Sequence, residues 1–85
     1  MVYDTLTSLL PAEVLARAKE FFAERVPASA AYPEKEGPTF LVLRGQGGEE
    51  IAIYAQEADT HTQVRASTLL FDQAVDRFLS ALPPA

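Results

Sequence analysis

The sequence predicts a small α+β domain: a helix, a three-stranded antiparallel meander and a second helix, with both helices on one face of the sheet. Two observations lead to this fold class. Apolar residues recur at helical spacing near each end of the chain, and three central segments alternate between apolar and polar residues. The 85 residues suffice for one hydrophobic core, so we expect a single domain over residues 1–85.

The first helix is predicted over residues 9–26. Its apolar residues fall on one side of a helix, and they are Val14, Leu15, Ala18, Phe21, Phe22 and Val26. Ser8 is a candidate N-cap, and Pro11 suits the first turn, where its missing N–H is not needed. Pro27 is expected to end the helix.

A surface loop and a hairpin are predicted next. Residues 28–38 contain Pro33, Gly37, Pro38 and three consecutive charged residues, which is typical of a loop. Residues 40–44 are short, apolar and rich in strand formers. The glycine-rich segment 45–48 is expected to reverse the chain into a second strand over residues 50–57.

The third strand and the last helix complete the predicted fold. Ala58 and Asp59 make a plausible tight turn, and residues 60–67 alternate again. Ser67 or Thr68 is expected to cap the last helix, and the two prolines near the end of the chain stop it. Its apolar stripe comprises Phe71, Ala74, Val75, Phe78, Leu79 and Leu82.

Residues 2–6 leave two alternatives open. Val2, Asp4 and Leu6 alternate with Tyr3 and Thr5, which fits a short extra strand, but the segment is also compatible with a frayed lead-in. As a strand it would cover an exposed sheet edge in its own molecule or in a neighbouring one.

The two faces of the predicted sheet differ in character. The core face is expected to consist of Leu41, Leu43, Ile51, Ile53, Ala55, Val64 and Ala66. The opposite face would carry Phe40, Val42, Arg44, Ala52, Tyr54, Gln56, His61, Gln63 and Arg65. Because contiguous apolar groups are costly to leave in water, three explanations stay open. The segment 28–38 or the N-terminal segment covers this face, two copies associate face to face or edge to edge, or a ligand or partner protein binds there.

Composition and charge exclude several classes of function. The formal charge of −5 repels phosphate backbones and anionic membrane surfaces, so we expect neither nucleic acid nor a membrane as partner. The chain has no cysteine, which rules out disulfides and thiolate sites. It contains no apolar run of membrane-spanning length, and residues 1–10 lack the features of a signal peptide, so we expect a cytoplasmic protein.

No motif for catalysis or cofactor binding is present. The predicted element order is shared with double-stranded RNA-binding domains, but residues 68–72 at the start of the last helix contain no lysine. Glu57, Asp59 and His61 alternate through the second turn, yet turns are commonly rich in such residues, and Asp59 is expected to stabilise the turn through its own backbone. We therefore predict no cofactor, no metal and no enzymatic activity. A small metal-dependent hydrolase or nuclease using these three residues is the remaining enzymatic hypothesis.

These observations predict a non-enzymatic interaction or assembly module that forms a homodimer. Its predicted contact surface consists of Phe40, Val42, Arg44, Tyr54, His61 and Arg65. The alternative is a small-molecule binding protein with a site between the sheet and the 28–38 loop, near Tyr32, Tyr54 and His61. No residues carry a resemblance to a known family.

Overall fold

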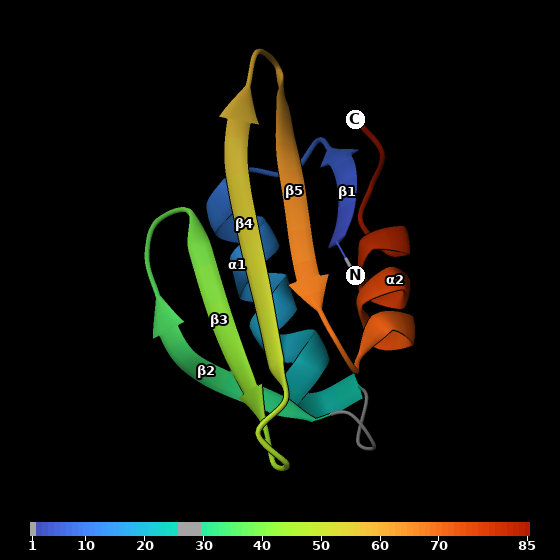
Figure 1. The fold of residues 1–85 in the computed structure, drawn as a ribbon. Coiled ribbons are helices and arrows are strands. Elements are labelled where there is room, and N and C mark those ends of the chain that lie inside the picture. Colours follow the sequence, from blue (N-terminus) through green and yellow to red (C-terminus); the bar gives the residue numbers. More distant parts are fainter. Residues whose placement is uncertain (1, 26–29) are drawn as a thin grey trace.

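A computed structural model describes residues 2–25 and 30–85 of the chain, and it confirms the α+β class. The sheet has five strands rather than the three predicted, so the helix, three strands, helix order is wrong. The elements are β1 (Val2–Thr7), α1 (Pro11–Glu20), the π-helical turn η1 (Phe21–Arg25), β2 (Ala31–Glu36), β3 (Phe40–Gly45), β4 (Glu50–Ala58), β5 (His61–Thr68) and α2 (Asp72–Ser80) (Figure 1).

The sheet is antiparallel throughout, with the strand order β1-β5-β4-β3-β2. The central strand β4 pairs with β5 on one side and β3 on the other. In Figure 1, α1 lies behind the sheet and α2 lies beside β1 and β5, while the near side of the three central strands carries no helix. The helices of the described residues therefore cover only one face of the sheet.

The predicted core face is confirmed. All seven of its residues are fully buried, and they are Leu41, Leu43, Ile51, Ile53, Ala55, Val64 and Ala66. They form one cluster with Val14 and Phe22 from the first helix and with Val75 and Phe78 from α2. Both helices thus pack against the same face of the sheet, as the alternation of the strands predicts.

Three phenylalanine rings join the helices to one another. In the wide turn η1, the consecutive residues Phe21 and Phe22 both reach Phe78, with ring centroids 5.5 and 5.6 Å from it. Phe21 and Phe22 meet edge to face at 5.1 Å. Phe22 is fully buried, so this cluster closes the core between the two helices.

The helix predicted over residues 9–26 is present as α1 and η1, but its cap differs from the prediction. Leu10, not Ser8, is the N-cap residue, and the Glu13 carboxylate accepts the Leu10 N–H at 2.9 Å. Pro11 occupies the first turn as predicted. The predicted stripe residue Val26 and the predicted stop at Pro27 lie outside the described residues.

The predicted loop over residues 28–38 is wrong where the structure describes it, because Ala31–Glu36 forms the edge strand β2. Only Ala31 in this strand is buried, so the sequence carries no apolar alternation. Pro33 is tolerated because an edge strand needs no N–H on its open side, and a bulge follows between Pro33 and Lys35. The first two residues of the predicted loop lie outside the described residues.

Residues 2–7 form a strand, which settles the open alternative. β1 pairs along its whole length with β5 and covers that edge in its own molecule. The C-terminal tail in turn lies beside the end of β1, since the Thr7 hydroxyl donates to the Pro83 carbonyl and Thr7 bridges Pro84. Tyr3 donates to Asp72 at 2.9 Å, and this hydrogen bond, with some burial, raises the pKa of the phenol.

The remaining turns and caps differ from the predictions by one to a few residues. Asp59 and Thr60 form the β4–β5 turn, while Ala58 still pairs with His61. Asp59 adopts a left-handed backbone at φ 57°, which aspartate tolerates better than most residues. Phe71 is the N-cap of α2, and its N–H donates to the Thr68 hydroxyl at 3.2 Å.

Candidate interaction surface

The side of the sheet that faces away from the helices, here called the outer face, carries all the residues of the predicted contact surface. They are Phe40, Val42, Arg44, Tyr54, His61 and Arg65. Tyr54 lies at the centre, opposite Phe40 on β3 and Arg65 on β5. His61, the first residue of β5, lies four residues before Arg65 and roughly 13 Å from it, so it stands apart from the others.

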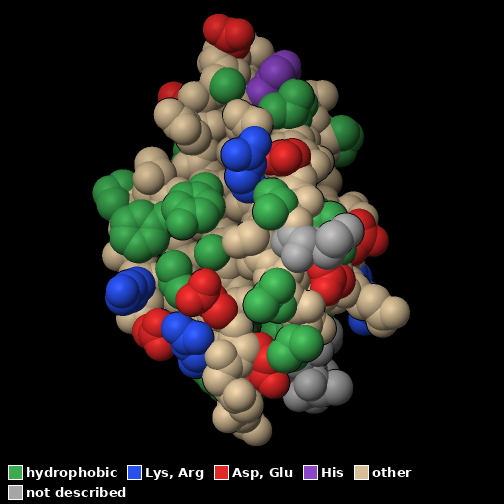
Figure 2. Space-filling view, in the orientation of Figure 1, with side chains coloured by type: hydrophobic (Ala, Val, Ile, Leu, Met, Phe, Trp, Pro, Cys, Tyr) green, Lys and Arg blue, Asp and Glu red, His purple; other side chains and the backbone are tan. Residues whose placement is uncertain are grey.

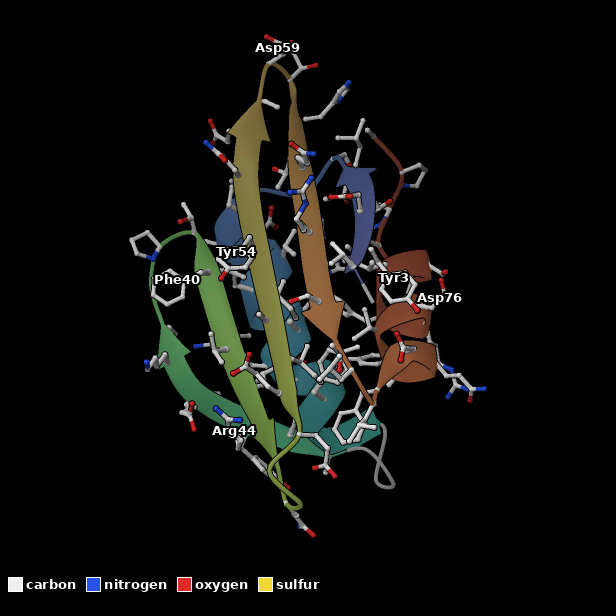
Figure 3. All side chains as sticks on the ribbon, in the orientation of Figure 1. Tyr3, Phe40, Arg44, Tyr54, Asp59 and Asp76 are labelled. Carbon is white, nitrogen blue, oxygen red and sulfur yellow. The ribbon has the colours of Figure 1, made fainter. Side chains whose placement is uncertain are left out.

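The outer face has an apolar centre. Tyr54 is 51% exposed, and Phe40 and Val42 are half-buried. The Phe40 ring packs on Gly37, where a side chain would overlap it. Figure 3 shows Phe40 and Tyr54 close together on the near side of β3 and β4, as their pairing requires. These rings lie away from the helices, as the strand alternation predicts.

The edge strands add apolar residues that sequence reasoning did not assign to this face. Val2 and Leu6 of β1 are 60% and 49% exposed, and they pair with outer-face positions of β5. Tyr32 of β2 lies opposite Arg44 and is also exposed. The alternation of Val2 and Leu6 in the sequence could have indicated that both residues lie on this face. That inference requires knowing that residues 2–7 form a strand.

Charged side chains on the outer face are arranged as ion pairs. Arg65 donates to Asp4 across β5 and β1 at 2.8 Å. Arg44 lies between two carboxylates, at 2.8 Å from Glu34 and 3.3 Å from Glu50. The hydrogen bond from Arg44 holds the pKa of Glu34 below its ordinary value, and the carboxylates raise the pKa of the guanidinium. The ion pairs are partly exposed, so they orient these side chains on the outer face but add little to the stability of the fold.

The outer face is electrically balanced although the chain is acidic. Among the residues that the structure describes, this face carries three carboxylates and three cations. They are Asp4, Glu34 and Glu50, and Lys35, Arg44 and Arg65. The whole chain carries a formal charge of −5, so the excess negative charge comes from the remainder of the sequence. Figure 2 shows apolar side chains over β3 and β4 with charges of both signs around them.

We expect the Glu34–Arg44 pair to make stability depend on acid pH. A carboxylate whose pKa is lowered in the folded state stabilises it above the ordinary value of 4.5, and this contribution is lost as the pH falls through the lower folded-state pKa. Glu34→Gln should therefore unfold more easily than the parent chain at pH 6, and the difference should be smaller at pH 3. Urea unfolding at both pH values measures this, with the exposed α1 carboxylate change Glu20→Gln as control. A difference that persists unchanged at low pH would contradict the pairing.

The outer face carries a shallow hollow rather than an enclosed cavity. It measures about 360 Å³ and is lined by Tyr54, Gln56, Gln63 and Arg65. The predicted ligand site beneath the 28–38 loop is not formed by the described residues, because Ala31–Glu36 lies within the sheet. Tyr32 and His61 belong to opposite ends of the sheet, roughly 25 Å apart along the strands, so they do not share a site.

Metal-ligating side chains do not gather in the described part of the chain. Across residues 2–25 and 30–85, no group of three or more His, Asp or Glu side chains is placed to hold a metal ion. The alternating set Glu57, Asp59 and His61 is thus not brought together. Within the same described residues, no helix has the length and apolar character needed to cross a membrane.

No protein-family model, curated protein or solved structure matches this chain. The function is therefore inferred from the chemistry of its own surface, and above all from the apolar-centred outer face.

Proposed function

We propose that this chain is a non-enzymatic interaction module that forms a homodimer through its outer face. The observation that supports this most directly is the apolar centre around Tyr54, Phe40 and Val42, which no described element covers. Contiguous apolar patches on soluble domains commonly mark protein–protein contacts, since their burial removes unfavourable apolar surface from water.

Within residues 2–25 and 30–85, no segment folds across this face. The two segments that could have folded across it, at the N-terminus and after η1, form the edge strands β1 and β2 instead. Both extend the sheet in its own plane. They enlarge the outer face and add Val2, Leu6 and Tyr32 to its exposed apolar groups.

Edge-to-edge pairing is disfavoured because both edges of the sheet are protected. β2 carries Pro33, a bulge and a run of charged residues, which are the features that natural sheets use to prevent edge pairing. The end of β1 is bridged by the C-terminal tail at Pro84, and α2 lies beside it. Face-to-face packing is therefore the favoured mode of association.

Charge and size favour a second copy as the partner. Two strongly acidic chains repel one another, but the balanced outer face is where that repulsion is weakest. Because the outer face carries equal numbers of positive and negative side chains, it does not favour a basic partner over an acidic one. The molecule measures 38 × 23 × 22 Å, so this face presents on the order of 800 Å², about what one partner buries in a standard interface.

The proposal predicts that the chain forms a dimer in a concentration-dependent way. It also predicts that a charged residue introduced on the outer face dissociates this dimer. Tyr54→Glu or Val42→Glu places an unpaired carboxylate in a dry interface, which should weaken the dimer at least about a hundredfold, since truncating or unpairing a buried charge costs about 3 kcal/mol or more. Analytical ultracentrifugation over a wide concentration range measures the dissociation constant.

The matched control is Leu10→Glu, which adds the same charge at a leucine that is 58% exposed at the start of α1, on the helix layer. It should leave the dimer intact. A parent chain that stays monomeric at millimolar concentration, or a Leu10→Glu variant that dissociates as readily as Tyr54→Glu, would overturn the proposal.

A further inference from the structure

Resting on the proposed dimer, we infer how its two copies are arranged. The two-fold axis runs across the strands, midway between Ala52 and Tyr54, so that Tyr54 of each copy packs on Ala52 of the other. The second sheet then lies antiparallel to the first, with their β4 strands crossing at the centre of the interface.

Shape is the first observation behind this arrangement. Val42, Ala52 and Ser67 lie in register across β3, β4 and β5 and form a row of small side chains. Two residues further along β4, in the same register, Phe40, Tyr54 and Arg65 form a row of large ones. Ala52 is only 7% exposed whereas Tyr54 is 51% exposed, so the first row stands lower on the sheet than the second. The low row is here called the groove and the high row the ridge.

The groove and the ridge both run across the strands and lie side by side. A surface of this shape fits a second copy of itself when the two-fold axis also runs across the strands. When this axis lies between the two rows, the ridge of the first copy faces the groove of the second. The groove of the first copy then faces the ridge of the second. Packed sheets lie about 10 Å apart with interdigitating side chains, which requires large groups to face small ones. The usual offset of about 30° between sheets displaces side chains this near the axis by less than one strand spacing.

Charge is the second observation, and it decides against the other simple two-fold. An axis parallel to β4 would place the two β4–β5 hairpin tips side by side, and each tip carries the exposed carboxylates of Glu57 and Asp59. It would also set Tyr54 against Tyr54 and Ala52 against Ala52. An axis across the strands sends the acidic tips to opposite ends of the dimer, where their repulsion is screened.

Exchanging the large and small residues tests the facing pair. Tyr54→Ala and Ala52→Tyr should each weaken the dimer about tenfold or more, because they create a void or a clash at the contact. The double variant places the tyrosine at position 52 opposite the alanine at position 54, and it should recover most of the affinity. If the arrangement is wrong, the double variant is at least as weak as the poorer single variant.

A distance measurement gives an independent test with an unchanged interface. The chain has no cysteine, so Thr60→Cys at the exposed hairpin tip accepts a single spin label. The antiparallel arrangement predicts labels roughly 40 Å apart in the dimer, whereas an axis along the strands predicts roughly 15 Å. A dimer with the short distance overturns this arrangement while the proposed function stands. A parent chain without any dimer overturns the proposed function itself.

Discussion

Ile53→Asp is expected to leave the chain unfolded at neutral pH, whereas Tyr54→Asp, one residue further along β4, is expected to remain folded. Ile53 is fully buried and lies between Leu41 and Ala66 on the core face. Burial without a partner raises the pKa of a carboxyl group by up to about 3–5 units, which costs about 4 kcal/mol against folding at pH 7. The lost packing of the isoleucine side chain adds about 2–5 kcal/mol. A small domain has a total stability of about 5–15 kcal/mol.

Tyr54→Asp is the matched variant on the opposite face of the same strand. Its side chain enters water on the outer face, so the cost is limited to lost packing and the low strand preference of aspartate, about 1 kcal/mol. Circular dichroism and thermal melts of both variants measure the difference. Equal loss of structure in the two variants would mean that the strand does not separate a buried face from an open one.

Phe22→Ala is the second change with a large expected effect. Phe22 is fully buried and its ring contacts Phe21 and Phe78, so truncation leaves a cavity between the helices. Such changes cost about 3–5 kcal/mol. At about 4–8 °C per kcal/mol for a domain of this size, the Tm should fall by more than about 12 °C.

Urea and thermal unfolding measure this loss, and Leu70→Ala provides the control. Leu70 is 72% exposed in the connection before α2, so its truncation should change the free energy of unfolding by less than about 0.5 kcal/mol. A loss below about 1 kcal/mol for Phe22→Ala would show that the ring cluster does not close the core.

Sequence patterns within single elements predicted the helices, the three central strands and the faces that these elements present. Leu41, Leu43, Ile51 and Ile53 alternate with polar or outward residues, and burial follows from that alternation. The candidate contact residues were identified from the same pattern. Their placement on the outer face thus came from the pleat alone.

The edge strands and the pairing of the charged side chains were decided only by the tertiary structure. β2 buries just Ala31, and its form depends on hydrogen bonds with β3, which a sequence without apolar alternation does not signal. The partners of Arg44 and Arg65 come from residues up to 61 positions away. An amphipathic pattern fixes which side of an element meets a core, but the neighbour of an edge strand is set by backbone pairing, which almost any side chain permits.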